Sequence, residues 1–158
     1  MSDAPVEGAN APDFDLPATG GGAKLSDYRG KPLILFFYPK DDTPGCTTEA
    51  NEFTALVDEI EAAGGAVLGV SRDSLAKHEK FAAKHDLKVR LASDEDGRVC
   101  EAYHVWVEKK MYGKTYMGVE RSTFLIDGDG RIAKAWRKVK PKGHAQAAFD
   151  ALRDLTTV

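Results

Sequence analysis

The amino-acid sequence predicts an α/β fold in which helices flank a mixed central sheet. Two continuous apolar runs of strand length, residues 32–38 and 66–70, have the pattern of strands buried on both faces. Helical periodicity follows each run, and a polar turn at residues 127–130 joins two further strand-like segments. Strand–helix units followed by a hairpin place parallel and antiparallel neighbours in one sheet.

Composition indicates a single globular domain over residues 1–158. A chain of 158 residues with 42% apolar and 30% charged residues can bury one core and is not disordered. The net charge of −3 does not favour nucleic acid or an anionic membrane as a partner. One basic cluster is interpreted as a solvated strand edge and loop: Lys134, Arg137, Lys138, Lys140 and Lys142.

The N-terminal residues 1–12 are expected to form a flexible lead-in. They hold neither an apolar run nor an early positive cluster, so they do not resemble a secretory signal. No window approaches the roughly 18 apolar residues that span a bilayer. We therefore expect a cytoplasmic protein, in a compartment that keeps thiols reduced.

The first half of the chain contains two predicted strand–helix units. Short extended pieces at residues 14–16 and 24–25 precede the strand at 32–38. A helix follows from about Cys46 to Ala63, and Ser74 caps a second helix that ends near His85. The expected apolar stripes are Phe53, Leu56, Val57 and Ile60 in the first helix, and Leu75, Phe81 and Ala82 in the second.

The second half is less regular. A short strand at residues 89–91 precedes a brief helix, and residues 106–118 remain ambiguous. Within them, Trp106, Met111 and Tyr112 either line a pocket or fill core, and core is the expectation. The final elements are a strand at 122–126, an antiparallel strand at 131–139 and a helix at 144–155. This order is typical of a thioredoxin-like α/β domain with an N-terminal extension and an insertion near residues 89–118.

Cys46 lies in the most informative stretch of the chain. The apolar run ends at Tyr38, a loop containing Pro39 and Pro44 follows, and a helix begins near the cysteine. A thiol at a helix start meets free backbone N–H groups and the positive end of the helix dipole, which favour the thiolate. Because an ordinary thiol is already about 3% ionised at pH 7, full ionisation raises reactivity by roughly 30-fold at most. Fast chemistry therefore also needs groups that stabilise the transition state.

The loop itself supplies some of these groups. The Thr43 hydroxyl can donate to the sulfur or to a substrate oxygen, or it can cap the helix. Pro39 can shield the sulfur from water. The backbone N–H groups of Gly45 and Cys46 can point at a bound oxygen.

A cation must come from elsewhere in the chain. Arg121 is the best placed candidate, because it opens the strand at 122–126, which can lie beside the strand at 32–38. The alternative is a surface charge at a strand end. Glu49, in the first turn of the helix, can hold the guanidinium in a bidentate pair.

The four histidines, His78, His85, His104 and His144, carry no metal-ligand spacing, and we expect them to be solvated or structurally satisfied. A cysteine hydrolase would need a base such as His104 or His144 near Cys46, and no motif supports that alternative. The two cysteines form neither a Cys-x-x-Cys motif nor a disulfide framework.

Residues 38–50 closely resemble the active-site segment of peroxiredoxins. Pro39, Thr43 and Cys46 match the Pro-x-x-x-Thr-x-x-Cys pattern, and the form Thr-Pro-Gly-Cys-Thr-x-Glu is similar to the peroxiredoxin Q subfamily, also called bacterioferritin comigratory protein. The resemblance continues in residues 109–114 and 121–127 and spans Ala11 to Leu155.

The resemblance implies a thiol peroxidase that reduces hydrogen peroxide and organic hydroperoxides. Cys46 would be the peroxidatic cysteine, Thr43 and Arg121 its catalytic partners, Pro39 its shield, and Glu49 the residue that orients Arg121. The thiolate would become a sulfenic acid, which a thioredoxin-like or small-thiol reductant recycles. The resemblance implies no metal, haem or flavin, and a monomer. A redox-sensing or chaperone-like interaction protein on the same fold is the alternative.

The sequence departs from the subfamily at the resolving thiol. Many members carry a second cysteine five residues after the first, where this chain has Asn51, and others carry it in the next helix, where residues 78–86 have none. Cys100 is the remaining candidate, and it is either a resolving cysteine or a small core residue. A bond to Cys46 needs Cα atoms within about 7 Å, after local unwinding of the helix. The alternative is a one-cysteine cycle resolved by an external thiol.

Overall fold

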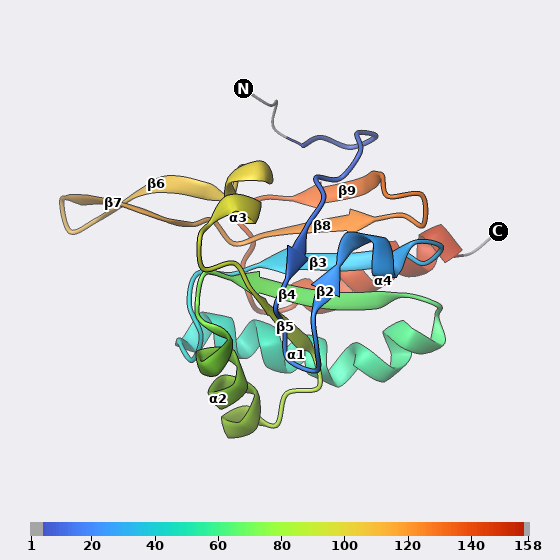
Figure 1. Cartoon of the computed structure of the whole chain (residues 1–158), viewed down its shortest axis with the longest axis horizontal. Helices are drawn as coiled ribbons and strands as arrows, with labels where there is room; N and C mark the ends of the chain where they lie inside the picture. The colour runs from blue at the N-terminus through green and yellow to red at the C-terminus, as the bar shows by residue number, and fades with distance from the viewer. Residues whose placement is uncertain (1–4, 157–158) are drawn as a thin grey trace.

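The computed structural model describes residues 5–156, and its centre is a five-stranded sheet (Figure 1). The strand order is β5-β4-β3-β8-β9. The strands are β3 (Leu33–Phe37), β4 (Ala66–Ser71), β5 (Arg90–Ser93), β8 (Ser122–Ile126) and β9 (Ile132–Trp136). Strands β3, β4 and β5 are parallel, whereas β8 and β9 run antiparallel to their neighbours. The predicted mixed sheet is therefore confirmed.

Helices and short strands cover the two faces of this sheet. The helices are α1 (Pro44–Ala62), α2 (Leu75–His85), α3 (Arg98–Ala102), α4 (His144–Thr156) and the 3-10 turn η1 (Leu25–Tyr28). The remaining strands are β1 (Asp15–Leu16), β2 (Ala23–Lys24), β6 (Trp106–Met111) and β7 (Lys114–Val119). Side chains from α1, α2 and α4 pack on one face, and side chains from β1, β2 and α3 pack on the other.

Alternation along β3 divides the buried side chains into two clusters. Leu33, Leu35 and Phe37 point into the cluster beneath β1, β2 and α3. Side chains at positions 34, 36 and 38 point into the cluster beneath α1, α2 and α4. Because successive strand residues face opposite sides, the sheet itself separates the two clusters. β3 is thus apolar throughout because both of its faces are buried, as the sequence predicts.

The pairing of β3 with β8 sets the position of the candidate cation. Phe37 pairs with Ser122 in an antiparallel register, so residue 121 lies at the end of the sheet where the loop after β3 begins. This neighbouring relation, together with the peroxiredoxin-like segment 121–127, points to Arg121 in the sequence.

The β6–β7 hairpin resolves the ambiguous segment and corrects one expectation. It extends away from the body of the molecule at one end (Figure 1). Tyr112 is 97% exposed and Met111 is also exposed, so neither fills core, while Trp106 is half-buried under the guanidinium of Arg72. The hairpin packs its strands mainly on each other, which leaves the side chains at its tip in solvent.

Smaller corrections concern the chain start and the helix stripes. Residues 8–11 bond to residues 130–132, so this part of the expected flexible lead-in is attached to the start of β9. Residues 1–4 of that lead-in lie outside the described residues. Leu56, Leu75 and Ala82 are only half-buried. His78, which the predicted stripe left out, is fully buried. Within residues 5–156, no helix is both long and apolar enough to cross a membrane.

Candidate active site

Cys46 is the third residue of α1 and is almost fully buried, with 2% of its surface exposed. Pro44 starts the helix with its fixed φ, and Thr43 precedes it in an extended conformation as the N-cap residue. The first backbone bond of the helix runs from Thr47 N to Thr43 O. The N–H groups of Gly45 and Cys46 precede that bond and are available to an oxygen at the helix start.

Arg121 connects the sulfur to a buried carboxylate. Its Nη2 donates to Cys46 Sγ at 3.3 Å, and its Nη1 donates to Glu49 Oε1 at 2.8 Å. Glu49 lies one helical turn after the cysteine, so both partners face the same guanidinium. The three residues proposed from the sequence as sulfur, cation and anchor are thus in direct contact.

Burial controls the charges in this group. Burial raises the pKa of Glu49 to about 7, although Arg121 opposes this shift. Burial alone would lower the pKa of Arg121, but Glu49 and then Cys46 outweigh it and raise that pKa above its ordinary value. Arg121 therefore remains a cation that can stabilise negative charge on the sulfur and on an attacked oxygen. Glu49 Oε2 has no hydrogen-bond partner, so Arg121 holds this carboxylate through one oxygen and the expected bidentate pair is not formed.

The Thr43 hydroxyl has a different partner from those expected. It donates to the carbonyl oxygen of Lys40 at 2.9 Å and makes no side-chain cap bond. Since a hydroxyl has one proton, the expected donation to the sulfur is not made in this structure. The free lone pairs of Thr43 Oγ1 can instead accept a hydrogen bond from a substrate hydroxyl.

Gly45 is needed because Arg121 lies directly over it. A Cβ at this position would stand 3.1 Å from Arg121 Nη2 and 3.2 Å from Pro141 Cγ. Both separations are shorter than ordinary contact, so a larger residue would displace the guanidinium. The requirement for glycine at this position of α1 is therefore steric.

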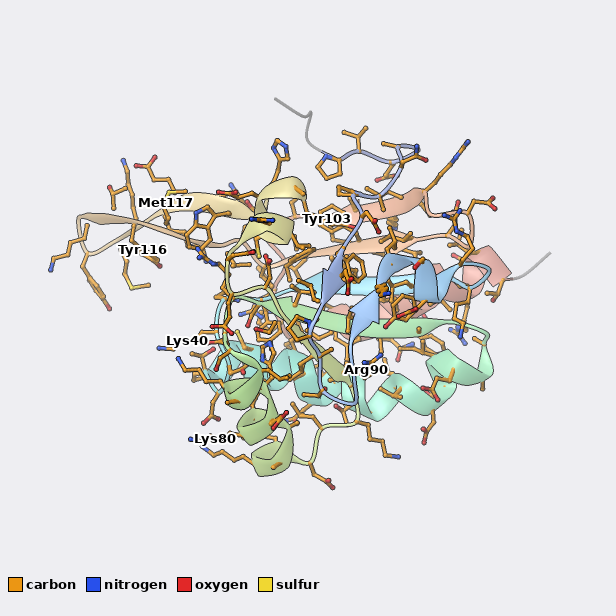
Figure 2. The ribbon with its side chains drawn as sticks, in the orientation of Figure 1. Lys40, Lys80, Arg90, Tyr103, Tyr116 and Met117 are labelled. Carbon is orange, nitrogen blue, oxygen red and sulfur yellow. The ribbon has the colours of Figure 1, made fainter. Side chains whose placement is uncertain are left out.

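A hollow of about 440 Å³ lies beside Pro39 and is partly lined by the β6–β7 hairpin. The residues around it are Pro39, Lys40, Arg72, Glu95, Trp106, Lys109, Tyr116, Met117, Gly118 and Val119. Figure 2 shows Tyr116 and Met117 on this hairpin. Pro39 therefore borders an open surface, and its shielding of the sulfur stays a prediction.

Lys109 is a site residue that the sequence reasoning missed. Burial lowers its pKa first, the positive charge of Arg121 lowers it further, and Cys46 acts in the opposite direction. Lys109 is therefore close enough to both residues for their charges to shift its pKa. Its only sequence signal was its place in the peroxiredoxin-like segment 109–114, which carried no assigned role.

Cys100 is not near Cys46. It lies in α3, is 0% exposed, and belongs to the cluster on the opposite face of the sheet. Its backbone N donates to Asp94 Oδ2 at 2.8 Å. Burial and the neighbouring Asp94 raise the pKa of the Cys100 thiol far above its ordinary value, so it is a protonated, weak nucleophile.

Among the described residues, neither histidine suggested for a hydrolase makes a hydrogen bond to Cys46. His144 Nε2 lies 2.8 Å from Thr123 Oγ1, and burial, followed by Arg121, lowers its pKa to about 4. The carbonyl of His104 accepts from Arg137 at the far end of α3. Among residues 5–156, no group of three or more His, Cys, Asp or Glu is arranged to hold a metal ion.

The chain matches known proteins over most of its length. Residues 8–135 match the model of the AhpC/TSA family. Peroxiredoxin Bcp of Bacillus subtilis is 49% identical over 150 residues, which cover 94% of this chain and 96% of the relative.

Two solved structures share the fold closely. Xanthomonas campestris bacterioferritin comigratory protein, studied for alkyl peroxide reduction, has a TM-score of 0.86 at 46% identity, covering 91% of this chain and 92% of that one. A cysteine-to-serine mutant of Xylella fastidiosa PrxQ has a TM-score of 0.91 at 41% identity, covering 98% of this chain and 99% of that one. Together with the cysteine, arginine and glutamate contacts, these matches show that the chain belongs to the AhpC/TSA family and, within it, to the peroxiredoxin Q, or bacterioferritin comigratory protein, subfamily.

Proposed function

We propose that this thiol peroxidase reduces hydrogen peroxide and organic hydroperoxides at Cys46. The observation that carries the proposal is the single guanidinium of Arg121, which contacts both Cys46 Sγ and Glu49. A cation at that point stabilises the sulfur as an anion and the charge that develops on the peroxide. The alkyl peroxide reduction studied in the Xanthomonas relative supports organic hydroperoxides as substrates.

The chemical step is an in-line displacement. The Cys46 thiolate attacks one peroxide oxygen, an S–O bond forms, and the O–O bond breaks. The attacked oxygen and its proton stay on sulfur as a sulfenic acid, while the leaving alkoxide or hydroxide takes a proton from water. Thr43 Oγ1 accepts a hydrogen bond from the peroxide O–H, and the N–H groups of Gly45 and Cys46 hold the neighbouring oxygen.

The cycle is completed by a thiol from outside the chain. Cys100 lies across the sheet from Cys46 and is held protonated, so an internal disulfide would require unpacking of both clusters. An external thiol, either small or on a thioredoxin-like protein, therefore condenses with the sulfenic acid. A second thiol then reduces the mixed disulfide and restores Cys46.

We further propose that the protein acts as a monomer in the cytoplasm. Every proposed catalytic group comes from one chain, and the cycle consumes reduced thiols, which the cytoplasm supplies. Sedimentation at several protein concentrations tests the oligomeric state. A mass that rises with concentration would argue against the monomer.

Replacement of Cys46 by serine tests the assignment. The Cys46→Ser variant should consume no hydroperoxide, whereas Cys100→Ser should consume it at the wild-type rate, because Cys100 takes no part. Turnover by the first variant would overturn the role of Cys46. A slow wild-type reaction with hydrogen peroxide, combined with tight binding of a client protein, would favour the redox-sensing alternative.

Intact-mass analysis tests the one-cysteine cycle. After one equivalent of peroxide, we expect the chain to gain an oxygen, or to gain a blocking group if the sulfenic acid is trapped. Loss of two hydrogens would mean an internal disulfide and would contradict the external thiol.

A further inference from the structure

A buried cluster of polar side chains joins α2 to the loop that carries Pro39 and Thr43. His78 is 0% exposed on α2, and its Nδ1 lies 2.7 Å from Asp41 Oδ2. Asp41 belongs to the loop between β3 and α1, and its Oδ1 accepts from the Tyr38 hydroxyl at 2.6 Å. The other ring nitrogen of His78 lies 2.8 Å from the carbonyl oxygen of Ala92 in β5.

These partners determine how many protons the pair holds. The carbonyl of Ala92 can only accept, so His78 Nε2 carries a proton. Between Nδ1 and the Asp41 carboxyl lies one further proton, because a neutral Nδ1 facing a carboxylate would set two lone pairs against each other. Tyr38 does not supply it, since burial and then Asp41 raise the pKa of its hydroxyl well above the ordinary value. Because Asp41 Oδ1 also accepts from Tyr38, we assign this proton to Nδ1, and the pair of His78 and Asp41 is an imidazolium–carboxylate ion pair.

The surrounding contacts attach the loop to the rest of the fold. The backbone N of Asp41 donates to Asp73 Oδ2 at 2.8 Å. Asp42 bonds to Lys84 and His85 of α2, at 2.7 and 2.8 Å, and has a φ of 62°, a conformation that non-glycine residues seldom adopt. Figure 2 shows Lys40 of the same loop beside the helix that carries Lys80.

We propose that His78 is a positioning residue for the peroxidatic site. Its protonated contact with Asp41 holds the residue 39–43 loop in place, and thereby sets Pro39 and the Lys40 carbonyl that orients the Thr43 hydroxyl. The proposal rests on the proposed function of Cys46. Nothing local in the sequence indicates it, because the two partners lie on different elements and meet only in the fold.

Two substitutions separate the loop contact from the general packing of His78. In His78→Asn, the amide nitrogen replaces Nδ1 and can still donate to Asp41. In His78→Gln, the amide nitrogen replaces Nε2 and can donate only to the Ala92 carbonyl. We expect the single-turnover oxidation of Cys46 by hydrogen peroxide to slow by about 10- to 100-fold in the glutamine variant, and by much less in the asparagine variant, since small misplacements of reacting groups have effects of this size.

The matched control is Tyr103→Phe. This variant removes the hydrogen bond from the Tyr103 hydroxyl to the Pro12 carbonyl, which lies on the opposite face of the sheet. It should lower stability without changing the oxidation rate. If the asparagine and glutamine variants are oxidised equally fast, or if oxidation rates simply follow stability across all three variants, the positioning role is wrong. Turnover by Cys46→Ser would instead overturn the proposed function, so the two failures are distinguishable.

Nitrogen NMR of the wild-type protein provides a readout that is independent of activity. We expect both ring nitrogens of His78 to carry slowly exchanging protons at neutral pH. The charged and titratable groups to be considered are Asp41 from the loop, Tyr38 from the end of β3 and Asp73 after β4. A neutral His78 with one unprotonated nitrogen would contradict the proposal.

Discussion

Arg121 serves two partners with one planar group. A guanidinium can donate to Cys46 and Glu49 at once, whereas an ammonium is a compact point charge without the same fork. We expect Arg121→Ala to slow the oxidation of Cys46 by about 10²–10³-fold, the effect of removing one donor from a developing negative charge. Arg121→Lys should fall between this variant and the wild type. Rapid-mixing measurement of the first oxidation step checks both, and an unchanged rate would remove Arg121 from the mechanism.

Glu49 should make stability depend on pH. Its pKa rises from an ordinary 4.5 to about 7 on folding, so the folded state binds more protons between these values. The free energy of unfolding therefore falls as pH rises from 4.5 to 7, by roughly 3 kcal/mol. His144, whose pKa is lowered to about 4, contributes an opposite slope over part of this window.

Glu49→Gln removes the first of these contributions. The difference in unfolding free energy between the wild type and this variant should fall as the pH rises from 4.5 to 7. Urea denaturation in a series of buffers measures it. A difference that stays flat from pH 4.5 to pH 7 would mean that folding does not raise the pKa of Glu49.

The sequence identified the residues of this site that belong to a contiguous motif. Cys46, Glu49 and Thr43 share one short segment, and Arg121 follows from the expected pairing of two strands together with the peroxiredoxin-like segment 121–127. The contacts of Lys109 and His78 were not predicted, because their partners are distant in the chain and only the fold brings them near. The hydrogen-bond direction of Thr43 was also beyond sequence reasoning, since it depends on the position of a single carbonyl.

At the scale of elements, α1 is held on the sheet by an aromatic contact. The rings of Phe36 in β3 and Phe53 in α1 stack with centroids 4.5 Å apart. Gly69 in β4 leaves room for this stack, because a Cβ there would stand 2.6 Å from Phe36 Cζ. The helix that carries the peroxidatic sulfur thus depends on a glycine in the neighbouring strand.

Gly69→Ala should destabilise the protein by about 1–3 kcal/mol, the usual cost of overpacking a core. Gly22→Ala is the control, since its nearest neighbour is 3.7 Å away and its backbone φ is not left-handed. Urea unfolding of both variants provides the comparison. Equal stability of the two variants would show that Phe36 can move without cost.

The elements were predictable where burial imposes a pattern. Strands β3, β4 and β8 are apolar because both faces are covered, and their apolar runs revealed them. Strands β6 and β7 are mostly exposed or half-buried, so their sequences show no regular alternation of apolar residues. The turn between them was visible only as Tyr112-Gly113, whose positive φ angles of 54° and 77° match a two-residue hairpin turn.

For the whole molecule, we predict a single cooperative unit. Both buried clusters are attached to the same five strands, so loss of one face exposes the other. Urea unfolding followed by tryptophan fluorescence and by far-ultraviolet circular dichroism should give coincident transitions. Two separate transitions would contradict the single-domain prediction.

The sheet that stands between the two cysteines also determines the fate of the oxidised enzyme. In the proposed one-cysteine cycle, Cys100 does not reach Cys46 across the sheet, so the oxidised Cys46 persists until a donor molecule arrives by diffusion. A second peroxide that arrives sooner converts it to a sulfinic acid, which ordinary thiols do not reverse. The lifetime of this catalyst under oxidative stress is therefore set by the ratio of donor to peroxide around it, and excess donor should protect it from inactivation.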